Sequence, residues 1–242
     1  MHPKPSMIAL GRPCMAAGTA LHAPLLTLGC RPAKVGTCQL ERAARSSSIF
    51  GCYRHALASF GVVPSDAEDL RWAIGPSIRE GFRQLLNGRG DAEEAVRRYR
   101  ERYSEWGLYQ GAVYSGILQA LAVHRARGTR LVLCTAKSHG FARRVADHFG
   151  LTPLLSGLYG SELDGRFEGK AELIAHLLEA EGLQPDDVCT VGDRKHDVIA
   201  AAAHGIPTIG VLWGFGGRNE LGSAGAAMLI QRADELLPVG VV

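Results

Sequence analysis

The second half of the chain alternates short apolar segments with helical patterns, and this alternation constrains the fold more than any other feature. The apolar segments lie at 130–135, 154–158, 188–191 and 208–212. Between them, one helical pattern is opened by Ser138 as a candidate N-cap and closed by Gly150, and another begins near Lys170. Strands that alternate with helices require right-handed crossovers and a parallel sheet covered on both faces. The sequence therefore predicts a doubly wound α/β core.

The region before this alternation shows only helical patterns. The apolar residues Ile49, Tyr53, Leu57 and Phe60 recur at helical spacing before Gly61. Two more helical stretches follow, near 75–87 and 91–106. We expect residues 49–112 to form a helical unit beside an α/β core at 113–242.

Residues 1–48 differ in composition from the rest of the chain. They are rich in Ala, Gly, Pro, Arg and Cys, contain Glu41 as their only acidic residue, and show no clear periodicity. Three interpretations fit this composition: an organellar transit peptide, a disordered extension, or a stretch that is not the natural protein sequence.

Charge and hydropathy exclude several classes of function. The net charge is only +3, and basic residues alternate with acids, as in 93–102, so we expect no nucleic-acid partner. No apolar run approaches the roughly 20 residues that span a bilayer, so we expect no membrane insertion. The six cysteines lack C-x-x-C spacing, and Cys134 and Cys189 lie in apolar strands. We expect buried, reduced thiols in a cytoplasmic protein.

Polar residues follow two of the predicted strands. Thr135 ends the strand at 130–135, and Asp193 and Asp197 follow the strand at 188–191. Ligands of doubly wound sheets bind where the carboxyl ends of strands converge, so these residues should face one crevice. Phosphoryl transfer needs positioned donors and cations, and Mg²⁺ prefers carboxylates, waters and substrate phosphate. The sequence predicts a site for Mg²⁺ and phosphate at this edge.

Four segments together suggest a family. Segment 131–137 is an apolar strand that ends in Thr135, Gly169-Lys170 opens a helix, 192–197 reads Gly-Asp-Arg-Lys-His-Asp, and 205–216 is a strand with a Gly-rich loop. In order and spacing they resemble the haloacid dehalogenase superfamily, and within it the phosphoglycolate phosphatase-like hydrolases. The resemblance covers about residues 49–237. It implies a Rossmann-like core with a small helical cap inserted near the N-terminus.

The resemblance also implies roles for individual residues. Asp193 would bind Mg²⁺ directly, and Asp197 would orient the site or bind the ion through water. Thr135 and the backbone N–H of Ala136 would hydrogen-bond the phosphate, and Lys170 would neutralise phosphate and nucleophile. The implied substrate is a small phosphorylated metabolite, either phosphoglycolate-like or a nucleotide or sugar phosphate. Nothing in the sequence distinguishes these substrates or specifies an oligomeric state.

Each of these residues also has a purely structural interpretation. Asp193 and Asp197 suit a turn and a helix N-terminus, Thr135 is a good strand former, and Lys170 is by default a solvated lysine. His196 beside the acids is more typical of an exposed turn than of a catalyst. The order and spacing of the four segments together favour the functional interpretation.

The attacking aspartate of that superfamily is missing. Members open with a strand ending in Asp-x-Asp-Gly-Thr, whose first Asp attacks phosphorus and whose second acts as general acid and base. The motif should fall around 35–41, where the chain reads Val-Gly-Thr-Cys-Gln-Leu-Glu. Gln39 and Glu41 have the right alternation, but an amide is no nucleophile and one glutamate does not replace two aspartates.

Three explanations remain open. The N-terminal segment could be translated from a shifted frame or wrong start, the chain could be a degenerate homologue, or it could be an active enzyme that uses Glu41. The coding DNA upstream of Ile49 distinguishes the first from the others. We expect hydrolysis by this chain to be impaired, because loss of a covalent nucleophile costs many orders of magnitude in rate. The alternative is a catalytically inactive phosphate- or partner-binding homologue.

Overall fold

The main sheet of the protein contains six parallel strands. The computed structural model describes residues 34–37, 41–43, 47–64 and 70–237. In spatial order the strands are β5 (Gly157–Ser161), β4 (Arg130–Ser138), β1 (Lys34–Thr37), β6 (Cys189–Gly192), β7 (Thr208–Val211) and β8 (Met228–Ile230). A second, antiparallel pair joins β2 (Glu41–Ala43) to β3 (Gly111–Val113).

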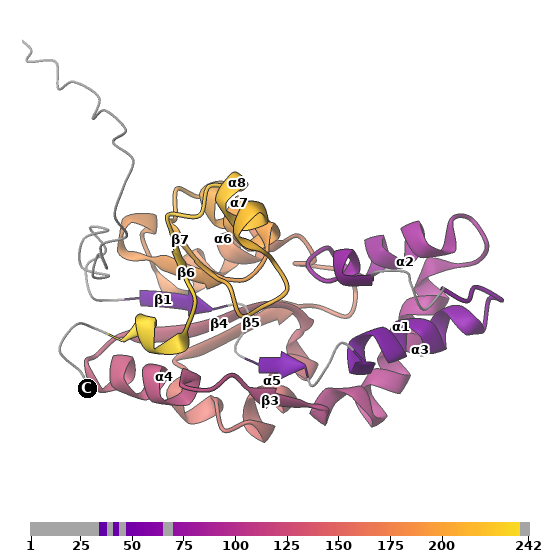
Figure 1. Cartoon of the computed structure of the whole chain (residues 1–242), viewed down its shortest axis with the longest axis horizontal. Coiled ribbons are helices and arrows are strands. Elements are labelled where there is room, and N and C mark those ends of the chain that lie inside the picture. Colours follow the sequence, from indigo (N-terminus) through magenta and orange to yellow (C-terminus); the bar gives the residue numbers. More distant parts are fainter. Residues whose placement is uncertain (1–33, 38–40, 44–46, 65–69, 238–242) are drawn as a thin grey trace, which may run out of the picture.

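Helices cover both faces of the main sheet (Figure 1). They are α4 (Ile117–Ala126), α5 (His139–His148), α6 (Lys170–Glu181), α7 (Lys195–Ala202) and α8 (Arg218–Ser223). Short 3₁₀ turns are η3 (Gly107–Tyr109), η4 (Thr152–Leu154), η5 (Pro185–Asp187) and η6 (Ala233–Leu236). Leu131 and Leu133 of β4 pack on the α4 and α5 side, whereas Val132 and Cys134 pack on the α6 and α7 side. The predicted doubly wound parallel α/β fold is confirmed.

A helical block lies at one end of the sheet (Figure 1). It consists of α1 (Ser47–Ala58), η2 (Leu70–Ala73), α2 (Ile78–Leu86) and α3 (Ala92–Glu105). Its apolar core is centred on Leu57, Phe82 and Val96, each at most 1% exposed. Val145 of α5 joins this cluster, so apolar contacts link the helical block to the α/β core.

Several element boundaries follow the sequence patterns. Helix α6 begins at Lys170, and Gly150 follows α5 with a φ of 69°, the left-handed conformation expected of a helix-ending glycine. Ser138 is the N-cap residue of α5, but its side chain makes no capping hydrogen bond. Strand β4 extends past Thr135 to Ser138, and a register shift between these residues bends its end.

No local pattern in the sequence indicates strand β1, although the family resemblance implies a strand that ends around 35–41. It pairs with both β4 and β6 in the middle of the main sheet. Its four residues, Lys-Val-Gly-Thr, are too few to show a periodic pattern. The backbone hydrogen bonds of two neighbouring strands place this segment. Tertiary pairing therefore determines a strand that local composition does not indicate.

The described cysteines, Cys52, Cys134 and Cys189, are buried thiols that form no disulfide among the described residues, as predicted for the two in strands. Cys14, Cys30 and Cys38 lie outside the described residues. No helix in the described part of the chain is long and apolar enough to cross a membrane.

Candidate functional site

A cavity of about 150 Å³ lies where the carboxyl ends of β4 and β6 meet the helical block. All five site residues predicted from the sequence line it: Thr135, Ala136, Lys170, Asp193 and Asp197. They come from β4, from the start of α6 and from the β6–α7 loop with the first turn of α7, three segments far apart in the sequence. The predicted convergence at one rim of the sheet is therefore present.

Asp193 is buried, with 3% of its surface exposed. Its Oδ2 accepts the backbone N–H of Phe215 at 2.7 Å, and its carbonyl oxygen accepts the N–H of Gly216 at 2.9 Å. Burial raises the pKa of this carboxyl above its ordinary value, against the lowering effect of the Phe215 N–H; the charge of Asp197 also raises it. A buried carboxylate that is costly to ionise gains most from a cation beside it.

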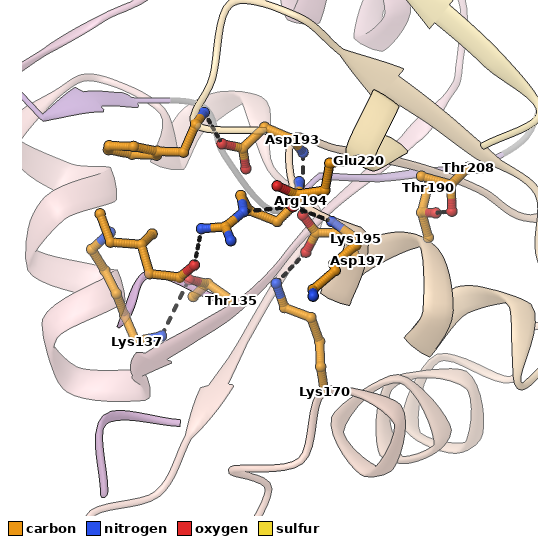
Figure 2. A network of polar contacts seen from close by, with 12 residues as sticks. Thr135, Lys137, Lys170, Thr190, Asp193, Arg194, Lys195, Asp197, Thr208 and Glu220 are labelled. Atoms are coloured by element: carbon orange, nitrogen blue, oxygen red, sulfur yellow. Dashed lines mark hydrogen bonds and ion pairs between the residues drawn. The ribbon is translucent and has the colours of Figure 1, made fainter. Parts of the chain in front are cut away.

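Asp197 is 2% exposed and uses both carboxylate oxygens within the protein. Its Oδ2 accepts the backbone N–H groups of Asp193 at 3.2 Å and of Arg194 at 3.0 Å, which caps the start of α7. Its Oδ1 pairs with the ammonium group of Lys170 (Figure 2). Asp197 therefore fixes the loop that carries Asp193 and holds Lys170 toward the cavity.

Thr135 faces the cavity from the end of β4 and is 7% exposed. Its Oγ1 accepts the backbone N–H of Lys137 at 3.3 Å, and the carbonyl of Ala136 accepts the hydroxyl of Ser161 at 3.1 Å. These bonds stabilise the bent strand end. Thr135 and Lys170 thus approach the cavity from a different strand and helix than Asp193.

Three glycines allow the backbone to pass close to the acidic pair. A Cβ atom on Gly192 would overlap the side chain of Asp197, one on Gly214 would overlap the carboxylate of Asp193, and one on Gly216 would overlap the Asp193 carbonyl oxygen. The loop after β7 therefore packs backbone directly against Asp193. This explains the Gly-rich sequence that follows β7.

Arg194 is a site residue that sequence reasoning missed. Its guanidinium is buried between the acidic loop and the helical block, and it lines the cavity. Arg100, which reaches the cavity from α3, was also missed. The sequence carries no signal for either residue, because their partners lie far along the chain: backbone carbonyls for both and, for Arg194, also the carboxylate of Glu220.

His196 is partly buried rather than an exposed turn residue, because its ring lies against Gly75 of the helical block. Its pKa is lowered by burial first and then by the charges of Arg194, Lys170 and Lys195. The imidazole therefore packs at the junction between the helical block and the α/β core.

The described residues fit a Mg²⁺ ion in part. They include no cluster of three His, Cys, Asp or Glu side chains able to hold a metal. Asp193 fits one ligand position, because it is buried, lines the cavity, and shows a hydrogen bond to only one carboxylate oxygen among the described residues. Mg²⁺ commonly binds through one or two carboxylates, with waters and phosphate completing the shell.

The register of β1 locates the region where the attacking aspartate is expected. Thr37 pairs with Leu133 of β4 and with Val191 of β6, each two residues before Thr135 and Asp193 respectively. The carboxyl end of β1 therefore lies at the rim of the sheet that holds the cavity. Gln39 lies outside the described residues.

Glu41 belongs to β2 in the second sheet, where it pairs with Val113.

Known proteins with similar sequence or structure include several phosphatases. A 5'-nucleotidase of Pseudomonas aeruginosa is 41% identical over 167 residues, covering 69% of this chain and 76% of the relative. Tyrosine-protein kinase PtkA of Mycobacterium tuberculosis is 35% identical over 190 residues, and the chain spans only 65% of its length. The crystal structure of a predicted phosphatase from Clostridium acetobutylicum superposes with a TM-score of 0.79 at 30% identity, covering 84% of this chain and 95% of that one.

The family comparison agrees with the fold and with the convergence of the site residues. Phosphoglycolate phosphatases are also among the relatives, which confirms the resemblance drawn from the four segments. The model of the haloacid dehalogenase-like hydrolase family matches residues 43–211. This chain therefore belongs to the haloacid dehalogenase-like hydrolases.

Proposed function

We propose that the cavity is a site for hydrolysis of small phosphate monoesters with Mg²⁺ as the cation. The observation that carries this proposal is that Thr135, Lys170 and Asp193, from three separate elements, line one cavity. A buried carboxylate beside a lysine and hydrogen-bond donors suits a bound cation and a phosphate together.

The roles follow from the contacts of each side chain. Asp193 supplies a carboxylate oxygen to Mg²⁺, which neutralises phosphate charge when bound. Asp197 acts as a positioning residue, because both of its oxygens are engaged by Lys170 and the backbone. Lys170, Thr135 and the backbone N–H of Ala136 donate hydrogen bonds to the phosphate oxygens.

We also propose that the helical block acts as the cap that selects the leaving group. Its Tyr53, Tyr99, Arg100 and Tyr103 line the cavity opposite the acidic pair. A cavity of about 150 Å³ lies below the roughly 300–1,000 Å³ of pockets for drug-sized ligands, which favours a leaving group of few atoms. A nucleoside would require the helical block to move away from the core.

The chain as it stands should hydrolyse such esters slowly. Residues 37–41 read Thr-Cys-Gln-Leu-Glu, and none of the five is an aspartate. Without an attacking carboxylate no aspartyl-phosphate forms, and the remaining site offers binding and charge neutralisation only. The alternative function, binding of phosphate or a partner without turnover, uses the same contacts.

The test measures Mg²⁺-dependent hydrolysis of p-nitrophenyl phosphate by this chain and by variants with a restored acid pair. One variant carries Asp at 37 and 39 (T37D/Q39D) and the other at 39 and 41 (Q39D/E41D), so both registers are covered. We expect little turnover by the unmodified chain and a gain of at least 100-fold in one variant, as for a regained nucleophile.

Adding Asp193→Asn to the active variant is the control, and it should remove the gain. Robust turnover by the unmodified chain, abolished by Asp193→Asn, would show that the chain is not impaired. If neither variant gains activity and isothermal titration detects no binding of Mg²⁺ with phosphate, the proposed site is wrong.

A further inference from the structure

Arg194 connects the acidic loop to the helical block through a buried guanidinium. Its side chain is 8% exposed, and its Nε–H donates to Oε1 of Glu220 at 2.8 Å. Its Nη1 donates to the carbonyl oxygens of Arg71, at 2.7 Å, and of Ile74. The Arg194 side chain therefore joins the loop that carries Asp193 to the helical block and to α8.

The segment 70–76, here called the connector, makes a second close contact with the same loop. Gly75 has a φ of 124°, and a Cβ atom there would lie 2.5 Å from Cδ2 of the His196 ring. The connector also supplies cavity-lining residues, among them Ile74 and Pro76. Its docking against residues 194–196 thus forms one wall of the candidate site.

The other end of this linkage is Asp193 itself. Oε1 of Glu220 accepts both the Arg194 side chain and the backbone N–H of Lys195, at 2.9 Å. The loop just before α8 donates to the Asp193 carboxylate and carbonyl, from Phe215 and from a neighbouring glycine. The backbone N–H groups of Asp193 and Arg194 both donate to Oδ2 of Asp197, so displacement of the connector acts through Arg194 on the hydrogen bonds that hold Asp193.

Arginine is the side chain that suits this position. A planar guanidinium donates hydrogen bonds in several fixed directions, so it binds a carboxylate and two carbonyls at once. A lysine ammonium on a flexible stem does not reproduce this geometry. Burial of a charge is costly unless it is paired and hydrogen-bonded. Undocking of the connector removes two of the hydrogen-bond acceptors that compensate the buried charge of Arg194.

We propose that Arg194 is a positioning residue that couples docking of the connector to binding of the cation and phosphate at Asp193. Each event favours the other, because coupling between two sites is reciprocal. This inference rests on the proposed function in one respect, the identity of the ligand at Asp193 as Mg²⁺ with phosphate.

The experiment measures hydrogen exchange of connector amides in the full chain, with and without Mg²⁺ and inorganic phosphate. In the unmodified protein we expect ligand to slow exchange of peptides covering 70–76. In Arg194→Lys we expect faster exchange without ligand, no further protection with it, and Mg²⁺-phosphate affinity weakened on the order of ten-fold, within the usual range of coupling energies. Glu220→Gln, which keeps the arginine, should give a smaller loss in the same direction.

Arg144→Lys is the matched control, because Arg144 also joins the core to the helical block, through the Ser104 carbonyl and the Tyr109 hydroxyl, but away from the cavity. It should leave connector protection unchanged. If both Arg194→Lys and Glu220→Gln keep normal ligand-induced protection, the coupling is refuted while the binding site stands. If the unmodified chain binds no Mg²⁺ and phosphate, both the proposed function and the coupling are wrong.

Discussion

The two aspartates of the site differ in how the protein uses them. Asp197 has a partner for each oxygen, namely Lys170 and two backbone N–H groups. Asp193 is buried beside it, and its pKa is raised above the ordinary value, chiefly by desolvation. The negative charge of Asp193 is therefore a local cost to folding, while that of Asp197 is compensated.

This difference predicts that Asp193→Asn stabilises the metal-free protein at neutral pH. A carboxyl whose pKa is raised on folding binds its proton more tightly in the folded state, so its ionisation lowers the free energy of unfolding as pH rises through the folded pKa. Melting temperatures measured from neutral pH down to the ordinary carboxyl pKa of 3.8 should show the gain shrinking as the Asp193 carboxyl is protonated.

Mg²⁺ provides the second arm of the same measurement. It should raise the melting temperature of the unmodified chain and leave that of Asp193→Asn unchanged, because only the former binds the ion. A variant less stable than the parent at every pH would contradict the assigned cost of the Asp193 charge.

Among the elements, those with long periodic patterns could be predicted from the sequence and those set by pairing could not. Helices such as α3 and α6 carry a helical face long enough to detect, and strands β4, β6 and β7 consist mostly of apolar residues. Strand β1 and the connector are short, and hydrogen bonds to distant segments place them. Thr135, Lys170 and the acidic pair could be identified because they lie at or near the ends of such detectable elements, whereas Arg194 and Arg100 could not.

Helix α3 carries a feature that predicts ligand preference. Arg100 lines the cavity, and burial first and then Arg79 lower its pKa. Among the described residues its one hydrogen bond goes to the Leu163 carbonyl, whereas Arg79 pairs with Glu93 and Glu168. A partly buried guanidinium that forms no ion pair with a carboxylate among the described residues favours a ligand that has a carboxylate group.

Arg100→Gln should therefore weaken binding of 3-phosphoglycerate, which carries a carboxylate, roughly ten-fold, the scale of one charge-assisted hydrogen bond. Binding of methyl phosphate should change little. Isothermal titration in the presence of Mg²⁺ compares the two ligands, and Arg97→Gln on the solvent side of α3 is the control. Equal losses for both ligands would argue against a second anion at Arg100.

The whole molecule contains two kinds of apolar core. One fills the helical block, and the others lie on the two faces of the main sheet. Among the described residues, the apolar groups that join them include Val145 and Phe141 of α5 and Phe149 just after it, and the polar links include those of Arg79 and Arg194. Parts of a protein with separate cores commonly open as separate units.

Phe82→Ala tests this division. Phe82 is fully buried in the helical block, and removing its ring should cost about 3–5 kcal/mol. Hydrogen exchange under native conditions should speed up in α1, α2 and α3 while amides of β4 and β6 keep their protection. Leu131→Ala, buried under the main sheet, is the reverse control. Equal acceleration everywhere by Phe82→Ala would mean that the protein opens as one unit.

The bonds of Asp197 also bear on how sequences of this kind should be interpreted. Because it ties the start of α7 to Lys170 and to the acidic loop, its loss would loosen the local structure whether or not any ester is ever cleaved. A descendant without an attacking acid would still be under selection to keep it. The presence of Asp197 is therefore evidence of an intact scaffold, whereas catalytic turnover depends on whether an attacking acid follows β1.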